Sequence, residues 1–235
     1  MDQSKLKVQN YYVNQLSADK LQRCYDLAPA RVQQYLKAEI NHVYDKIKPG
    51  ERLLELGCGY GRVIPQFAAR AGFVIGIDTS KTSISKGQKA LNLIGHCHLL
   101  VMNAIQLGFP DQSFDRVICI QNGISAFHID PRKLILEVVR VTKLGGSTIF
   151  SSYADEFWPY RLEWFKLQAA AGLIGEIDIN KTGNGIIVCK DGFTATDPTP
   201  KNWTVYKLSR RGYNGCRKAT EGGSIWPAED TPRNR

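Results

Sequence analysis

The stretch that decides the fold is residues 52–64, RLLELGCGYGRVI, an apolar run followed by glycines at every second position. Bulky apolar residues before a cluster of glycines are typical of a buried strand that ends in a turn. A glycine turn that opens a helix lets the backbone, including its N–H groups, approach a ligand closely. We therefore expect a ligand against this loop.

The remainder of the chain alternates between strand-like and helix-like segments. Apolar runs predict five strands, at residues 52–56, 73–77, 98–102, 116–120 and 147–151. Helical spacing of apolar residues predicts helices between several of them, at 62–70, 82–93 and 131–142, and two more between 16 and 47, divided by Pro29. This order predicts an α/β fold with a doubly wound, mostly parallel sheet, which binds ligands at the carboxyl ends of its strands.

The spacing of the glycines bears on the kind of ligand. The dinucleotide fingerprint is G-x-G-x-x-G, but its last glycine position is Arg62 here, which argues against NAD or FAD. Asp78 follows the second strand, where a carboxylate can accept hydrogen bonds from both hydroxyls of a ribose. A lone Asp at this place is also commonly a turn or capping residue, so both roles stay open on the residues alone.

Composition limits the broad class. Of 235 residues, 43% are hydrophobic and 23% are charged, as in an ordinary globular protein. No apolar run or N-terminal leader suggests a membrane segment or secretion, so we expect a cytoplasmic protein. The six cysteines lack metal-ligand spacing, and no metal is expected. The net charge of +9 raises nucleic acid as a partner, but much of the excess lies in residues 207–235.

Together these segments resemble the class I S-adenosylmethionine-dependent methyltransferases. ELGCGYG at 55–61 is similar to the family's first pattern, E/D-x-G-x-G-x-G. The similarity continues in order through IDTS at 77–80, NAIQLGFPDQSFDRVIC at 103–119 and EVVRVTKLGGS at 137–147. The resemblance implies a Rossmann-like, seven-stranded sheet with an N-terminal helical lid and a C-terminal insertion. It also implies S-adenosylmethionine as methyl donor and S-adenosylhomocysteine as product.

The resemblance also assigns residues to the cofactor. These are Glu55, Gly57, Cys58, Gly59, Gly61, Asp78, Thr79, Asn103, Ala104 and Gln121. Glu55 corresponds to an acid near the ammonium group, Asp78 to the ribose ligand, and Gln121 borders the sulfonium and the acceptor. Asn103 stands where the family usually has Asp, and its carbonyl oxygen can still accept from the adenine amine.

Methyl transfer needs a general base only when the acceptor carries its proton at neutral pH. The candidates are His128, shortly after the fourth strand, and Tyr25 from the N-terminal helices. For each of them, a packing or surface role is the more common explanation.

The expected organisation has four segments. They are a helical lid at 1–48, a cofactor-binding core at 49–152, acceptor-pocket elements at 153–210 and a basic stretch at 211–235. The chain lacks the D/N-P-P-Y/F pattern of amino-methylating nucleic-acid enzymes, since residues 121–124 read QNGI, and it lacks a Pro-Cys pair. We therefore expect a small-molecule acceptor. An RNA- or protein-directed methyltransferase, or a non-catalytic cofactor-binding regulator, remains an alternative.

Overall fold

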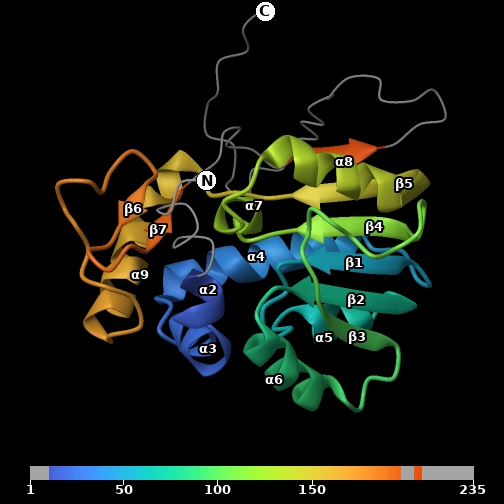
Figure 1. Ribbon diagram of the computed structural model, residues 1–235, viewed down its shortest axis with the longest axis horizontal. Helices are drawn as coiled ribbons and strands as arrows, with labels where there is room; N and C mark the ends of the chain where they lie inside the picture. Colours follow the sequence, from blue (N-terminus) through green and yellow to red (C-terminus); the bar gives the residue numbers. More distant parts are fainter. Residues whose placement is uncertain (1–10, 197–203, 208–235) are drawn as a thin grey trace, which may run out of the picture.

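The structure, a computed structural model, describes residues 11–196 and the backbone of 204–207. Its central sheet has the strand order β3-β2-β1-β4-β5-β8 (Figure 1). The strands are β1 Arg52–Leu56, β2 Phe73–Asp78, β3 Cys97–Val101, β4 Phe114–Cys119, β5 Thr142–Phe150 and β8 Thr204–Lys207. Strands β1 to β5 pair in parallel, and β8 pairs antiparallel with β5. The expected α/β fold with a parallel sheet is confirmed, but the seven-strand count is not, because the described residues supply six strands to this sheet.

Among the described residues, the five predicted helices form, with ends that differ by a few residues, and three more form at residues 11–14, 123–126 and 158–170. They are α2 Tyr11–Asn14, α3 Ala18–Asp26, α4 Ala30–Lys46, α5 Ile64–Ala68, α6 Lys81–Leu91, α7 Gly123–Ala126, α8 Pro131–Val141 and α9 Trp158–Ala170, with a 3₁₀ turn at Asp155–Phe157. Among the described residues, no helix is both long and apolar enough to cross a lipid bilayer.

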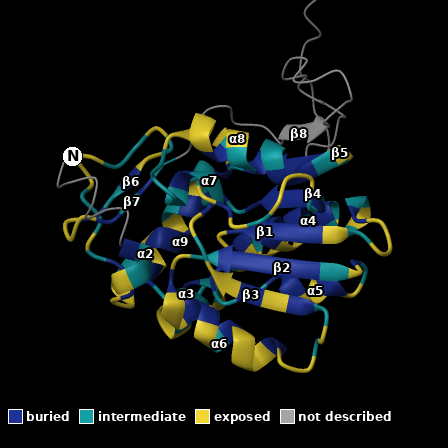
Figure 2. Ribbon diagram, turned by 45° about the vertical axis from the view of Figure 1, so that its right-hand side comes forward, coloured by how far each residue is buried: buried dark blue, intermediate teal, exposed yellow. Residues whose placement is uncertain are grey.

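The sheet is buried on both faces, which explains why its strands are nearly continuous apolar runs. Leu53 and Val74 pack with residues of α4, α5 and α6 on one face. Leu54 and Ile75 pack with residues of α8 on the other. Figure 2 shows the central strands as mostly buried. Successive residues of a strand point to opposite faces, so each pair of neighbours contributes to both cores.

A third hydrophobic cluster lies beside the sheet. It joins α2, α3 and the first half of α4 to residues 153–196, which include α9 and the small hairpin of β6 (Ile187–Val188) and β7 (Thr194–Ala195). We call residues 11–36 and 153–196 the side lobe. Figure 1 shows α2 and α3 next to α9 and β6–β7. Helix α4 spans both parts, since Val32 is buried in the side lobe and Val43 is buried under the sheet.

Residues 176–180, EIDIN, are strand-like in sequence, but they form no strand in the structure. Within this segment, pairing is limited to one antiparallel bridge between Ile177 and Cys189. Ile179 is exposed, so the alternating pattern of this segment does not correspond to a buried face.

The strand order reverses beside β1: β2 and β3 follow on one side of it, and β4 and β5 follow on the other side. In open α/β sheets a crevice forms at such a point, beyond the carboxyl ends of the strands. Glu55 in β1, Asp78 at the end of β2 and Gln121 after β4 all lie at this edge. The topology therefore brings together residues that are far apart in the sequence.

Candidate functional site

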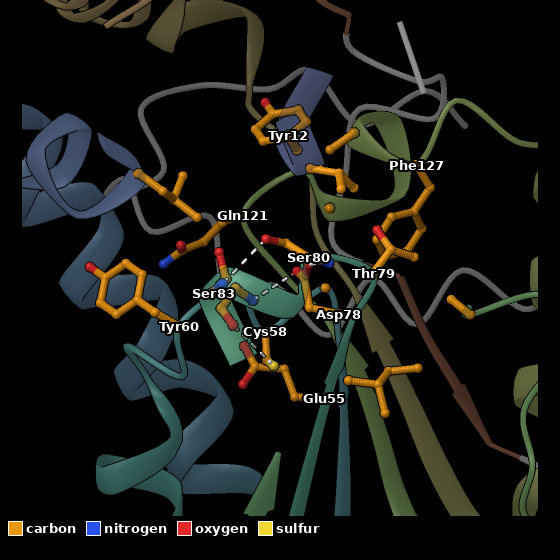
Figure 3. Close-up of a pocket in the computed structure, with 18 of the residues that line it drawn as sticks. Tyr12, Glu55, Cys58, Tyr60, Asp78, Thr79, Ser80, Ser83, Gln121 and Phe127 are labelled. Carbon is orange, nitrogen blue, oxygen red and sulfur yellow. Dashed lines mark hydrogen bonds between the residues drawn. The ribbon is translucent and has the colours of Figure 1, made fainter. Parts of the chain in front are cut away.

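A cavity of about 480 Å³ opens at this edge of the sheet. One side is formed by lining residues of the segments 55–60 and 78–80, which we call the loop wall. The other includes lining residues of segment 12–25, in α2, α3 and their connection, which we call the helix wall. Figure 3 shows Tyr12 of the helix wall opposite Asp78 and Glu55, with Tyr60 and Gln121 to one side and Phe127 to the other. The volume is within the range of pockets that enclose small ligands and cofactors.

The backbone conformation and close packing of the loop require glycine at positions 57 and 59. Gly57 and Gly59 have φ of +72° and +57°, a conformation that costs other residues about 1–2 kcal/mol. A Cβ atom at Gly57 would lie 2.8 Å from the ring of Phe127, and one at Gly59 would lie 3.0 Å from Leu21. Hydrogen atoms at these two positions therefore allow other groups to approach the loop closely.

The N–H groups of the loop are already used within the protein, contrary to one expectation from the sequence. Those of Gly57 and Cys58 donate to the carbonyl oxygen of Ile77 at 2.8 and 2.9 Å. The N–H of Gly59 donates to Oδ2 of Asp78 at 2.9 Å. These bonds tie the loop to β2, so the glycines provide close approach of the backbone rather than free donors.

Asp78 fills the turn role that the sequence leaves open, and its role as a ribose ligand stays a prediction. It lines the cavity, and its Oδ1 accepts from the N–H of Ser80 at 2.7 Å while Oδ2 accepts from Gly59. Burial raises the pKa of Asp78, and these N–H bonds oppose the rise. Each carboxylate oxygen has two acceptor sites, so further hydroxyl donors can still bind. The cap of α6 is Ser80, whose side chain accepts from Ser83.

Glu55 is a buried acid with unused hydrogen-bonding capacity. Its side chain lines the cavity, and Oε2 has no hydrogen-bond partner among the described residues. Burial raises the pKa of Glu55 to about 8; the Arg62 charge opposes this rise and Asp78 adds to it. A buried carboxylate without a full set of partners is costly unless a cation or donor is supplied. The site is thus suited to a positively charged ligand group next to Glu55.

Gln121 is fixed by partners from three elements. It adopts φ of +56°, and its N–H donates to Glu39 Oε1 and Ser151 Oγ, both at 2.9 Å. Its side-chain Oε1 accepts from Nη2 of Arg62 at 2.6 Å, whereas its buried Nε2 has no partner among the described residues. The carboxyl end of β4 therefore presents a rigidly held amide to the cavity.

Glu39 is a residue that the sequence reasoning missed. It lies in α4, is 1% exposed, and accepts from the hydroxyl of Ser151 as well as from Gln121. Burial raises the pKa of Glu39 to about 7. Its signal in the sequence is an acid inside the apolar stripe of a helix, between Leu36 and Ile40, where a charged side chain needs partners from elsewhere in the fold.

Most residues predicted for the site line the cavity. They are Glu55, Gly57, Cys58, Gly59, Asp78, Thr79, Asn103, Ala104, Gln121 and Tyr25. Gly61 is not among the lining residues; a Cβ atom there would lie 3.1 Å from Leu91 and Leu99, so this glycine serves packing against α6 and β3.

The two candidate bases differ in position. Tyr25 lines the cavity; burial raises its pKa, and the nearby Arg62 opposes the rise. His128 is absent from the lining, although its neighbours Phe127 and Ile129 belong to it. Burial lowers the pKa of His128, which favours the neutral ring. A role as base remains a prediction for both.

The segment 153–196, expected to shape the acceptor pocket, does not supply lining residues of this cavity. It packs behind the helix wall. The ring centroids of Trp164 and Tyr25 are 5.8 Å apart, and those of Phe193 and Tyr12 are 6.0 Å apart. The segment therefore supports the helix wall from outside. The basic stretch 211–235 lies outside the described residues.

Comparisons with known proteins agree with this geometry. Residues 54–150 match the family described as "Methyltransferase domain". The chain is 26% identical over 183 residues to 24-methylenesterol C-methyltransferase 2 of Arabidopsis thaliana, covering 72% of this chain and 50% of that protein. It is 28% identical over 177 residues to the arsenite methyltransferase of Rattus norvegicus, covering 61% and 47%.

A solved structure extends the similarity beyond the matched domain. The PH0226 protein from Pyrococcus horikoshii OT3 superposes with a TM-score of 0.53 at 21% identity, covering 86% of this chain and 84% of that one, and so supports the fold. The chain spans about half the length of the curated relatives named above. Fold, matched domain and cavity agree: residues 54–150 match a methyltransferase domain, and the chain is similar to S-adenosylmethionine-dependent methyltransferases, whose cofactor is S-adenosylmethionine.

Proposed function

We propose that this protein transfers the methyl group of S-adenosylmethionine to a small-molecule acceptor by in-line displacement. The observation that carries the proposal is the unpartnered, buried Glu55 oxygen in a cavity beside a glycine loop. This arrangement fits a cofactor that has an ammonium group and needs close contact with backbone. A side chain at Gly57 would meet Phe127, so the space along the loop is preserved by glycine.

The proposed roles follow from the remaining capacity of each side chain. Glu55 accepts from the ammonium group through Oε2, and Asp78 accepts from the ribose hydroxyls through its unused acceptor sites. Asn103 and Ala104 contact the adenine. The Asn103 carbonyl oxygen already accepts from Ile105 N–H at 3.1 Å, which fixes its orientation and leaves a second acceptor site. Gln121 borders the sulfonium.

The protein's contribution to the reaction is orientation in a dry cavity. The bound sulfonium supplies an electrophilic methyl group, so the residues of this chain need only align the acceptor and exclude water. Apolar residues such as Leu16 and Leu21 from the helix wall and Phe127 after α7 line the cavity and exclude water from it. Alignment of two reactants can lower a barrier by up to about 7–11 kcal/mol. Tyr25 or His128 acts as base only for an acceptor that must lose a proton.

The helix wall acts as a lid in this proposal. The N–H of Ala18 donates to Ser83 Oγ at 2.9 Å, and the hydroxyls of Thr82 and Ser17 are 3.0 Å apart. These contacts, together with an ion pair between Lys86 and Asp19, join α3 to the start of α6. Few polar contacts hold this edge, so separation of α3 from α6 would give the cofactor access at a small cost.

The named activities of the relatives support a small acceptor. One is a sterol C-methyltransferase and another is an arsenite methyltransferase. Those acceptors differ widely in size and chemistry, so the acceptor itself is not transferred to this chain. The largely apolar helix wall supports a small acceptor with apolar surface.

A two-stage experiment tests the proposal. Calorimetry should show that S-adenosylhomocysteine binds the full chain, and labelled S-adenosylmethionine should then transfer methyl to a member of a panel of sterols, quinols, amines and trivalent arsenic. Asp78→Asn is the matched variant for the binding stage. Absence of binding would overturn the assignment of the site. Binding with no product from any small molecule, RNA or protein would support a regulatory role, and methylation confined to RNA or protein would replace the acceptor class.

A further inference from the structure

Arg62 lines the cavity, although the sequence patterns assign it no contact with a ligand. It follows the last glycine of the loop and stands just before α5. Its side chain lines the cavity, its guanidinium centre lies 4.1 Å from the centroid of the Tyr25 ring, and its Nη2 donates to Gln121. The side chain is therefore held between the helix wall and the carboxyl end of β4.

The charges around the cavity are unequal and specific. Among the described residues that line it, Arg62 is the sole Lys or Arg, and Glu55 and Asp78 are the sole acids. Arg62 is close enough to Glu55 to oppose the rise in the pKa of that carboxyl. A positive group and an acid with an unpartnered oxygen thus lie near each other at the same cavity.

This pair matches an α-amino acid. The methionine part of S-adenosylmethionine carries an ammonium group and a carboxylate on the same carbon, and the adjacent sulfonium is positive. A guanidinium beside that sulfonium would oppose binding unless an anion of the ligand lay next to it. A planar guanidinium binds a carboxylate through two parallel N–H groups, and the bond from Arg62 to Gln121 uses only one of its five N–H groups.

We infer that Arg62 binds the methionine carboxylate of the cofactor, next to the Glu55 subsite for the ammonium group. This inference rests on the proposed function and adds a binding residue to it. Burial favours the protonated form of Glu55 in the empty cavity. When the ammonium group of the ligand holds Glu55 ionised, the two acids and Arg62 give one net negative charge, which complements the one net positive charge of S-adenosylmethionine. Gln121 and the ring of Tyr25 hold the guanidinium in place before the ligand arrives.

Ligands that lack one group at a time test the assignment. The probes are S-adenosylhomocysteine, its decarboxylated analogue S-adenosyl-3-thiopropylamine, and 5′-methylthioadenosine, which lacks both the carboxylate and the ammonium group. For the variant Arg62→Met, whose apolar stem can still pack on Tyr25, calorimetry should show about 10- to 100-fold weaker binding of S-adenosylhomocysteine. Binding of the other two probes should change by less than about twofold.

Two further variants make the result specific. Glu55→Gln should weaken the binding of both probes that carry the amine and leave the binding of 5′-methylthioadenosine unchanged. Arg62→Lys, which keeps the charge but not the paired N–H groups, should lose less than Arg62→Met. The matched control is Arg70→Met, because Arg70 lies just beyond α5 and stacks on Tyr44 instead of lining the cavity. It should leave all three affinities unchanged, and melting temperatures would verify that each variant is folded.

The outcomes separate this inference from the function on which it rests. If Arg62→Met weakens the binding of all three probes equally, Arg62 acts by packing, and the inference is wrong. If the three affinities are unchanged and only the KM of an acceptor rises, Arg62 recognises an anionic acceptor instead. If neither calorimetry nor thermal shift detects binding of S-adenosylhomocysteine to the unmodified protein, the proposed function is wrong, whatever the role of Arg62.

Discussion

The loop wall and the helix wall face the same cavity but are held by different forces. The loop wall comes from two short segments, and backbone hydrogen bonds from Gly57, Cys58 and Gly59 fix it to β2. The helix wall is apolar and aromatic, and it is supported from behind by side chains such as Trp164. Backbone bonds define positions tightly, whereas apolar packing tolerates substitutions of similar volume. The loop wall is thus strictly specified, and the helix wall is open to variation.

The largest effect is expected at the tightest point of the loop wall. Gly57→Ala should lower the free energy of unfolding by about 2–4 kcal/mol, because it combines an unfavourable positive φ with an overlap with Phe127. Gly50→Ala is the control: its φ is +81°, but no atom lies within 4 Å of the added Cβ, so it should cost only about 1–2 kcal/mol. Equal losses in urea denaturation would show that the Phe127 contact does not constrain the loop.

The second effect concerns Glu39, which connects α4 to the turn after β4. Its pKa in the folded protein is about 7, raised from 4.5, so the folded state favours the protonated form. This contribution to stability is present below pH 4.5 and is lost as the pH rises through 7. Glu39→Gln, which cannot ionise, should therefore gain up to about 3 kcal/mol over the unmodified protein between pH 5 and pH 8. A stability difference that is the same at both values contradicts the prediction.

The third effect tests the loop wall through the ligand. Asp78→Ala should weaken the binding of S-adenosylhomocysteine by about 1–3 kcal/mol in calorimetry. The substitution removes a hydrogen-bond acceptor for the ligand and also the acceptor that holds the N–H of Gly59. Asp111→Ala is a suitable control, since Asp111 is exposed and pairs with Arg140. Unchanged affinity in the Asp78 variant would remove this residue from the site.

The smallest effect is expected in the side lobe. The hydroxyl of Tyr11 donates to Asp191, which joins α2 to the β6–β7 hairpin. Tyr11→Phe should cost about 1 kcal/mol in unfolding free energy and leave cofactor affinity unchanged. Tyr44→Phe, on the sheet side of α4, should change neither quantity. A loss of cofactor affinity in the Tyr11 variant would mean that the two walls are coupled more strongly than their separate supports indicate.

The sequence predicts the loop wall well and the contacts of Gln121 poorly, for a physical reason. Glu55 and Asp78 belong to strand ends, and their placement follows from local periodicity and from the topology of a parallel sheet. Glu39 and Arg62 acquire their roles through contacts with Gln121, which is far from both in the chain. The spacing of residues cannot reveal such contacts, and it wrongly implied that the loop N–H groups were free for a ligand.

The shared cluster of the side lobe has a consequence for biosynthesis. Residues 11–36 leave the ribosome before the core, yet their apolar surfaces, including Tyr11 and Val32, pack against residues 153–196, which emerge much later. The strands β1 to β5 can pair in the interval, because the contacts among them lie within residues 52–150. The helix wall thus assembles after strands β1 to β5 on a nascent chain, and its exposed apolar segment is the part that a chaperone would have to protect.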